Sequence, residues 1–383
     1  MWQRVPAVAR RTLASLPQTR LATKAARTLT ADKLRILGFH GVDDLPAFER
    51  LVRTTTQLYT PVSAEQVVSW LQGGDSLPEH SVWFTFDDGL PSTFDAGGVL
   101  EELGISATAF VCPSTVEQPA RLWFQTVFAA EQVGIRIPES KEHPSLTALK
   151  RLPNRDRIAY VTQLEQALVC AGNDPGPPLG LDRLRTWTSQ GHSVGNHTWS
   201  HPCLDTCTET EQRHEITHAH EQLQKWGFEP TLFAYPNGNH TASSEQVLKE
   251  LGYDAAILFD HHLSSMPCHP HRISRLRIDS DINDRRALSI LSGSHSTAFH
   301  LGTGLATIRR SRHDRQPHLP RLEDACTGRA RRGPGGGGAG PRRGRAQQRG
   351  VVAEHPGRDP APPGAARGGA RDVGGGTGVR RGL

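Results

Sequence analysis

Two neighbouring carboxylates follow an apolar run in the segment Phe84-Thr-Phe-Asp87-Asp88-Gly89. Adjacent carboxylates repel each other, so the pair is easiest to explain if one of them binds a cation. The other is then free to act as a general base, and the glycine lets the chain turn sharply after the pair. An ordinary Asp-Asp-Gly turn has the same letters, so this motif needs support from elsewhere in the chain.

Two histidines four residues apart, His197 and His201, follow a second apolar run. They face the same way if the segment turns helically. Two imidazole nitrogens and one carboxylate suit zinc or another divalent transition metal, and they leave positions open for water and substrate. Because both motifs follow apolar runs, we expect the histidines and one of the two carboxylates to form a metal site.

A third apolar run ends in Tyr235-Pro236-Asn237-Gly238. Its Pro and Gly shape a tight turn whose backbone N–H groups can point at a developing oxyanion. On its own the segment is an ordinary turn. The aromatic residues that suit stacking on a sugar ring, and that equally suit plain core positions, are Trp123, Trp199 and Tyr235.

The stretch His214-Glu215-Ile-Thr-His218 matches the H-E-x-x-H signature of zinc proteases. With 19 histidines in the chain, such a match by chance is not rare. No Gly-x-x-His continuation follows it. The exposed face of an amphipathic helix is the simpler interpretation, and a zinc metalloprotease on His214 and His218 remains an alternative.

Apolar runs alternate along the chain with amphipathic helical patterns, which indicates a parallel α/β sheet or barrel. Ser63 and Gln66 form a capping box for a helix that reaches Leu71. The predicted strands cover 34–39, 81–86, 105–112, 192–197, 231–235, 254–259 and 274–278. The other predicted helices cover 47–58, 93–103, 122–133, 157–170, 182–190, 209–226 and 244–251.

Composition divides the chain into a body and two flanking segments. Residues 1–33 are predicted to be a poorly ordered lead-in, and 34–302 the folded domain, with a helical insertion at 121–180. Residues 303–383 hold 17 of the chain's 44 basic residues but only 6 of its 39 acidic ones. From Gly328 onward the tail has no aromatic residue, so we predict that it is disordered. An RNA-binding Arg/Gly tail is the alternative.

The net charge of +5 therefore arises in the tail, because the body holds 27 basic and 33 acidic residues. A mildly acidic body gives no reason to expect specific binding to nucleic acid. No apolar stretch has the length of a signal peptide or of a membrane span, and we expect a cytoplasmic protein. The 6 cysteines contain no C-x-x-C pair and are expected to be reduced thiols.

The two strongest motifs, Thr85-Phe-Asp87-Asp88-Gly89 and His197-Thr-x-x-His201, resemble the polysaccharide deacetylase family (NodB homology domain, carbohydrate esterase family 4). The likeness covers about Leu34 to Ile278. It implies a distorted (β/α) barrel that hydrolyses the N-acetyl group of an amino sugar or an N-acetylated polysaccharide, a carbon–nitrogen bond that is not a peptide bond. It also implies that Asp87 is the base and that Asp88, His197 and His201 are the metal ligands.

The chain departs from the common family pattern in one motif. Most members have an Arg-Pro-Pro-Tyr-Gly segment whose arginine orients the base, whereas here the matching stretch is 234–238 and holds no arginine. Arg275 or Arg277 on the last predicted strand is the replacement we consider. The pattern resembles the subgroup that acts on exopolysaccharide amino sugars, in which an N-terminal histidine, here His40, is the acid. Competing donors are His269, His271, His295 and His300.

The resemblance and the residues together define the expected function. The metal is expected to be Zn²⁺, with Co²⁺, Ni²⁺, Mn²⁺ and Fe²⁺ also suited to the ligands, and the partner to be an N-acetylated carbohydrate. Tyr235, Asn237 and Arg275 are the residues expected to contact the oxyanion or the substrate. A catalytically inactive carbohydrate-binding barrel is the other alternative, besides the protease.

Overall fold

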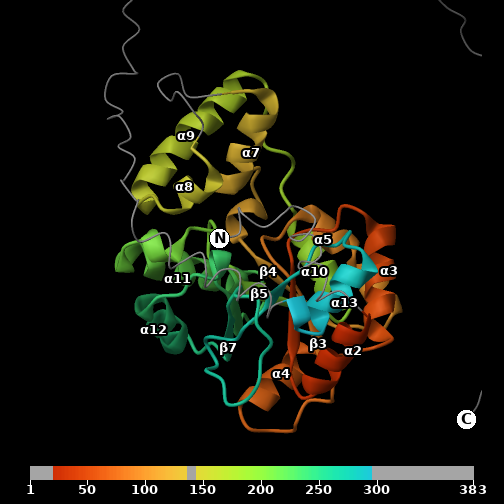
Figure 1. The fold of residues 1–383 in the computed structure, drawn as a ribbon. Coiled ribbons are helices and arrows are strands. Elements are labelled where there is room, and N and C mark those ends of the chain that lie inside the picture. The colour runs from red at the N-terminus through yellow and green to blue at the C-terminus, as the bar shows by residue number, and fades with distance from the viewer. Residues whose placement is uncertain (1–19, 136–143, 296–383) are drawn as a thin grey trace, which may run out of the picture. The chain divides into compact units, whose positions relative to one another are not determined.

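The central feature of the fold is a parallel sheet that curls into a barrel (Figure 1). The computed structural model describes residues 20–135 and 144–295. The strands are hydrogen-bonded in the order β7-β6-β5-β4-β3-β1-β8, with β2 beside β3. Their bounds are Arg35–Phe39 for β1, Thr60–Pro61 for β2, Ser81–Phe86 for β3, Ala107–Val111 for β4, Ser193–Asn196 for β5, Leu232–Ala234 for β6, Ala255–Ile257 for β7 and Leu276–Arg277 for β8.

The two edges of the sheet meet at a parallel bridge between Ile257 of β7 and Ile273, shortly before β8. One segment of chain therefore pairs with β7 at its beginning and with β1 at its end. The expected distorted (β/α) barrel with parallel strands is confirmed. The carboxyl ends of parallel strands gather on one face of a barrel, and active sites of barrel enzymes lie there.

Both faces of the barrel wall are buried, which explains why its strands are near-continuous apolar runs. Alternate residues point to opposite sides of a strand. In β3, Phe84 and Phe86 pack in the layer between barrel and helices, whereas Trp83 packs in a second cluster with Ile36 and Ile257. All six residues of β3 are buried, and the strand has the predicted bounds.

Helices surround the barrel, and most of them were expected from the sequence. Their bounds are Leu45–Thr56 for α3, Ala64–Leu71 for α4, Pro91–Asp95 for α5, Gly97–Glu102 for α6, Leu181–Ser189 for α10, Glu209–Lys225 for α11, Ala242–Glu250 for α12 and Asp284–Leu291 for α13. The capping box of Ser63 and Gln66 is present at the start of α4.

The helix predicted over 93–103 is instead two short helices, α5 and α6, which meet at Ala96. Gly97 explains the interruption, because glycine is a poor helix former. A Cβ atom at Gly97 would lie 2.4 Å from Oε1 of Gln190 and 3.3 Å from the ring of Trp187. The chain therefore breaks here to pack closely against the end of α10.

The predicted insertion at 121–180 contains α7 (Trp123–Val133), α8 (Leu146–Lys150) and α9 (Asn154–Cys170). These helices lie together beside one end of the barrel, at the top of Figure 1. They have a hydrophobic cluster of their own, in which Val127 of α7 packs with Leu149 of α8 and Leu164 of α9. The short α8 was not predicted from the sequence.

Residues 20–29, which fall in the predicted lead-in, form helix α2 (Arg20–Leu29). Tertiary contacts explain why it forms despite its weak sequence signal: it packs against α13, and Nη1 of Arg27 donates to the carbonyl O of Leu58 at 2.9 Å. The segment 1–19 and the predicted tail 303–383 lie outside the described residues. Within the described ranges, the cysteines are all free, as expected, and no helix is long and apolar enough to cross a membrane.

Candidate functional site

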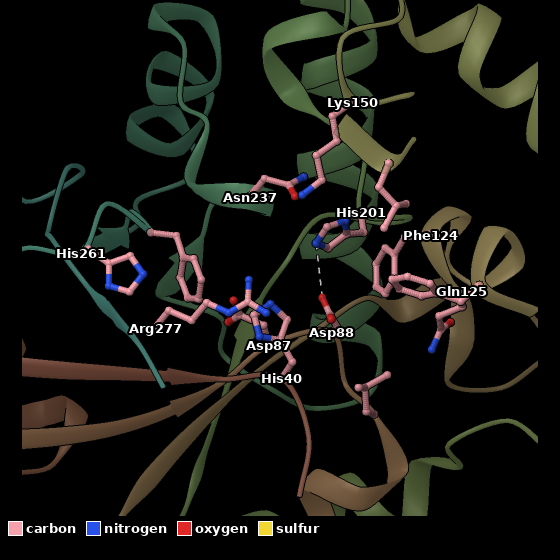
Figure 2. Close-up of a pocket in the computed structure, with 14 residues that line it drawn as sticks. His40, Asp87, Asp88, Phe124, Gln125, Lys150, His201, Asn237, His261 and Arg277 are labelled. Atoms are coloured by element: carbon pink, nitrogen blue, oxygen red, sulfur yellow. Dashed lines mark ion pairs between the residues drawn. The ribbon is translucent and has the colours of Figure 1, made fainter. Parts of the chain in front are cut away.

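A cavity of about 670 Å³ opens at the carboxyl ends of the barrel strands, and several of the residues singled out from the sequence line it (Figure 2). The barrel and the insertion both line it. The barrel contributes His40, Asp87, Asp88, Leu90, His201, Asn237, Phe259, His261 and Arg277. The insertion contributes Phe124, Gln125, Phe128, Leu146 and Lys150.

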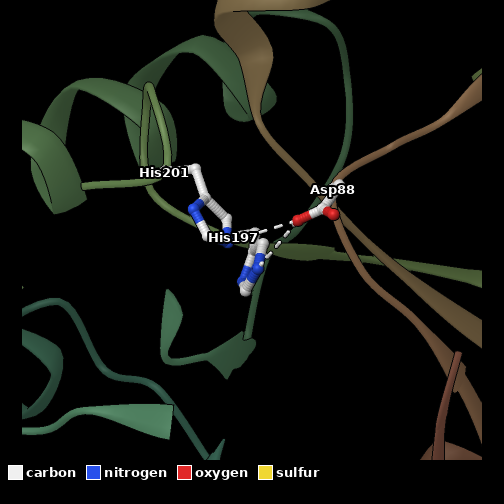
Figure 3. A group of neighbouring side chains, drawn as sticks. All are labelled: Asp88, His197 and His201. Atoms are coloured by element: carbon white, nitrogen blue, oxygen red, sulfur yellow. Dashed lines mark ion pairs between the residues drawn. The ribbon is translucent and has the colours of Figure 1, made fainter. Parts of the chain in front are cut away.

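Asp88, His197 and His201 form a buried group of potential metal ligands (Figure 3). Oδ1 of Asp88 lies 3.5 Å from Nε2 of His197 and 3.3 Å from Nε2 of His201. One ligand atom from each residue lies within 4.8 Å of the other two. Oδ1 of Asp88 and Nε2 of His197 are buried and have no hydrogen-bond partner in the described part of the chain. Such atoms need a partner, and a divalent cation between them fits.

Contacts and burial set the tautomer of His197 and the charge states of His201 and Asp88. Nδ1 of His197 lies 2.7 Å from the carbonyl O of Ala234, so this nitrogen is the donor and Nε2 keeps its lone pair. Burial lowers the pKa of His201 to about 4, which leaves its ring neutral at physiological pH. Burial alone would raise the pKa of Asp88, but His201 and His197 outweigh it and hold that pKa well below its usual range.

The second carboxylate, Asp87, is paired with an arginine from the other end of the domain. Nη1 of Arg275 donates to Oδ1 of Asp87 at 2.7 Å, and Nη2 donates to Oδ2 at 2.5 Å. Arg275 is fully buried and Asp87 nearly so. Burial tends to raise the pKa of Asp87. The guanidinium of Arg275 and the ring of His197 lower this pKa by more than burial raises it, so the carboxyl is ionised. Of the two arginines considered, Arg275 contacts Asp87, and Arg277 lines the cavity.

Gly38 in β1 makes room for this pair. A Cβ atom there would lie 2.5 Å from the ring of Phe259 and 2.9 Å from Nε of Arg275. The Arg275 guanidinium also stacks on Phe259, with its central carbon 4.6 Å from the ring centroid. A glycine inside a buried strand often marks a close approach of this kind.

His40 lines the cavity next to the carboxylates, directly after β1. Its ring meets Phe259 edge-on, with centroids 5.4 Å apart. Burial lowers the pKa of His40 below its usual value, although Asp88 and Asp87 act in the opposite direction. Position therefore supports a proton-transfer role, and the lowered pKa means that the ring is mostly neutral at pH 7.

The turn after β6 brings one of its two predicted residues into the cavity. Asn237 lines it and has a left-handed backbone with φ of 57°. Tyr235 is fully buried outside the cavity lining, and its hydroxyl donates to the carbonyl O of His271 at 3.2 Å. Its backbone N–H donates to Ile257 at 3.1 Å, so neither group is available to an oxyanion.

The remaining aromatic candidates lie outside the cavity lining. Trp123 is buried, and its Nε1 donates to the carbonyl O of His201 at 2.9 Å. The ring of Trp199 lies 4.0 Å from that of His218. The aromatic side chains in the cavity are instead Phe124, Phe128 and Phe259, which sequence patterns did not distinguish from core residues.

The structure also shows where most of the other candidate histidines lie, both those considered as the general acid and those of the H-E-x-x-H stretch. His269 pairs with Glu245, and the ring of His271 with Tyr253, both outside the cavity lining. His261 lines the cavity and was missed, because one histidine on a loop carries no distinguishing pattern. Within residues 20–135 and 144–295, His214 and His218 belong to no group of three metal ligands. The other two candidate donors are His295, which is described but does not line the cavity, and His300, which lies outside the described ranges.

Comparisons with known proteins agree with the motifs. Residues 74–256 match the polysaccharide deacetylase family model. A chitin deacetylase of Colletotrichum lindemuthianum is 30% identical over 95 residues, which cover 24% of this chain and 36% of that protein. The chain thus matches only about a third of the length of this curated relative.

Solved structures also resemble the chain, at low sequence identity. The Streptococcus pyogenes deacetylase PplD, solved with acetate, is 18% identical, with 67% of this chain and 96% of that chain covered and a TM-score of 0.47. IcaB from Ammonifex degensii is 16% identical, with 69% and 97% covered and a TM-score of 0.49. The stretch 74–256 that matches the polysaccharide deacetylase family model holds Asp87, Asp88, His197 and His201.

Proposed function

We propose that the protein is a metal-dependent hydrolase that removes the acetyl group from an N-acetylated amino sugar. The observation that carries the proposal is the joint placement of two groups around one cavity: the Asp88, His197 and His201 ligand group, and the Asp87 carboxylate paired with Arg275. Amide hydrolysis needs a polarised carbonyl, an activated water, a base and an acid. Each need has a candidate here.

Asp88, His197 and His201 are the residues that would hold the metal. When bound there, a divalent cation supplies Lewis acidity to the acetamide carbonyl and makes a nearby water more acidic. Two nitrogens and one oxygen suit Zn²⁺, and the ligand set also accepts Co²⁺, Ni²⁺, Mn²⁺ or Fe²⁺.

Asp87 is the proposed general base. Its two hydrogen bonds to Arg275 keep the carboxylate ionised and fix its plane, so it can take a proton from the attacking water. Water adds its oxygen to the acetamide carbon, and the backbone N–H of Asn237 is the proposed donor to the oxyanion. The C–N bond then breaks, acetate leaves and the nitrogen takes up a proton.

His40 is the proposed source of that proton. Amines leave poorly unless they are protonated as the C–N bond breaks. His40 lines the cavity together with Asp87, and only its protonated form can act. Because burial lowers its pKa, the donor form is the minor one at neutral pH, and both groups exchange their protons with solvent before the next turnover.

An N-acetylated carbohydrate is the proposed substrate. The family match and the chitin deacetylase relative support this class. The presence of His40 and the absence of an arginine at 234–238 support a substrate of the kind used by the subgroup that acts on exopolysaccharide amino sugars. The open cavity, lined by Phe124 and Phe128 on one side, has the volume for a sugar residue.

Acetate release tests the proposal. The full chain is incubated with N-acetylglucosamine oligomers, with added Zn²⁺ or Co²⁺ and with chelator. Metal-dependent acetate release is expected. Sugar binding without acetate release would instead identify an inactive carbohydrate-binding barrel, and cleavage of a peptide substrate would revive the protease alternative.

A further inference from the structure

Glu215, the middle residue of the His214-Glu215-x-x-His218 stretch, lies against the loop that carries His201. Its Oε2 accepts a hydrogen bond from the backbone N–H of Ser200 at 2.8 Å, and its Oε1 lies 2.7 Å from Oγ of Ser200. Its own carbonyl O accepts from the N–H of Trp199 at 3.0 Å. One residue of α11 thus makes three hydrogen bonds to the two residues that precede His201.

This loop needs such support because its backbone is unusual. Thr198 and His201 both have left-handed conformations, with φ of 67° and 60°. Non-glycine residues keep such conformations only where their surroundings hold them. Within the loop, the N–H of His201 donates to Oγ1 of Thr198 at 3.1 Å. From α11, the carbonyl O of Ile216 accepts from Nδ2 of Asn196 at 3.2 Å.

We infer that Glu215 is a positioning residue for the metal site: it holds Ser200, and through it the ring of His201, in the place from which His201 binds the metal. The inference rests on the proposed function. It gives the H-E-x-x-H letters a meaning other than a protease, because the glutamate supports a metal loop instead of serving as a base. His214 and His218 have no part in it.

A positioning role requires only that the side chain at 215 forms hydrogen bonds to Ser200, and not that it takes up a proton. A glutamine at 215 can accept from the N–H of Ser200 with its carbonyl oxygen, and its amide N–H can donate to Oγ of Ser200. A positioning residue therefore tolerates Glu215→Gln, whereas a general base does not, because an amide takes up no proton. Glu215→Ala removes both side-chain bonds.

The matched control is Glu211, one turn earlier on the same helix. Its carboxylate accepts from the N–H of Thr208 at 2.7 Å and from Nδ2 of Asn154 at 3.1 Å, so it caps α11 and does not touch the metal loop. Glu211→Ala weakens the start of the helix and reports what a purely structural loss does.

The test measures Co²⁺ and Zn²⁺ affinity of the purified full chain by competition with a chromophoric chelator, together with the visible spectrum of bound Co²⁺. Glu215→Ala should weaken binding about 10- to 100-fold, the usual effect of losing a residue that orients a ligand, and should alter the Co²⁺ spectrum. Glu215→Gln should stay within about threefold of wild type, and Glu211→Ala should bind normally despite a lower thermal midpoint.

Each result decides between the possibilities. Wild-type affinity in Glu215→Ala, or equal losses in Glu215→Gln and Glu215→Ala, overturns the inference while the proposed function stands. A wild-type chain that binds neither metal overturns the proposed metal site itself and the positioning role with it. If Glu215→Ala does not fold, Ser200→Ala, which removes one of the two bonds, must weaken Co²⁺ binding measurably, and unchanged affinity there overturns the inference.

Discussion

Arg275 and Asp87 lie 188 residues apart in the chain, yet the guanidinium of one makes two hydrogen bonds to the carboxylate of the other, at 2.7 and 2.5 Å. Closure of the barrel makes this contact possible. Arg275 lies between Ile273, which bridges to β7, and β8, which pairs with β1. Arg275 therefore connects the place where the barrel closes, the seam between β7 and β8, to Asp87, the proposed base.

The first prediction concerns this pair. Arg275→Lys keeps the positive charge but cannot bind both carboxylate oxygens in one plane. We expect kcat for acetate release to fall roughly 10²-fold, the lower end of what a general base contributes, while the protein remains folded. Arg272→Lys is the control, because Arg272 pairs with Glu245 outside the cavity lining. Equal kcat values in the two variants would contradict the role of Arg275.

The same variant predicts a change in pH dependence. Arg275 helps to hold the pKa of Asp87 below its usual range, against the effect of burial. A weaker contact raises that pKa, so the carboxylate becomes protonated at a higher pH as the solution is acidified. The acid limb of the kcat/KM profile should therefore move to higher pH in Arg275→Lys. A profile whose acid limb stays in place, or moves to lower pH, would show that Asp87 is not the titrating base.

The second prediction concerns metal binding. Asp88→Ala, His197→Ala and His201→Ala should each lower bound metal per chain, because each removes one of the three clustered ligands. His214→Ala and His218→Ala should not. Elemental analysis of the purified variants measures this. In wild type, metal at 100 times its Kd should stabilise the fold by about 2.7 kcal/mol, and chelator should remove that stabilisation. Retention of metal in the first set, or its loss in the second, would reverse the assignment.

The third prediction separates proton donation from the rest of the chemistry. His40→Ala should abolish cleavage of an acetamide but spare an activated acetate ester, because a phenolate leaves without a proton. His261→Ala, also in the cavity, and His295→Ala are the controls. Since the pKa of His40 lies below its usual value of about 6.5, wild-type kcat/KM for the amide should decline as pH rises through that pKa. An amide rate in His40→Ala equal to wild type would move the search for the acid to His261.

The fourth prediction concerns the wall that the insertion provides. The side chain of Phe128 lines the cavity and is 45% exposed, so it is free to contact a sugar ring. Phe128→Ala should raise KM roughly 3- to 10-fold, the scale of one aromatic contact, with little change in kcat. Ile158 on α9, which is 53% exposed and absent from the cavity lining, supplies the control variant Ile158→Ala. A lower kcat with unchanged KM would place Phe128 in the chemistry instead of in binding.

The comparison between sequence and structure shows which features are local. The strand Ser81–Phe86 and the helix that starts after Ser63 were predictable because apolar runs and capping boxes are short-range signals. The proximity of Asp88, His197 and His201 was predictable because each follows a strand, and the ends of parallel strands converge. Helix α2 was missed because contacts with α13, far along the chain, stabilise it.

Which side chains reach the cavity depends on tertiary packing, and sequence patterns do not predict that packing. Arg275 and Arg277 are two residues apart, and only the placement of the seam decides which one contacts Asp87. Tyr235 was expected near the substrate, but its hydroxyl points to His271. Phe128 and Lys150 enter the cavity because of the way the insertion packs on itself, and no motif marks them.

The hydrogen bond from Trp123 to the carbonyl of His201 has a consequence for exchanging parts between related enzymes. Segment 121–180 connects β4 to α10, so a chimaera with a shorter connection would keep every strand pairing of the barrel. It would nevertheless leave the His201 carbonyl without its indole donor and the His201 ring without Phe124, whose centroid lies 5.0 Å away. A transplanted insertion would therefore have to supply a hydrogen-bond donor to this carbonyl. Substrate selectivity could not be exchanged by replacing the insertion alone.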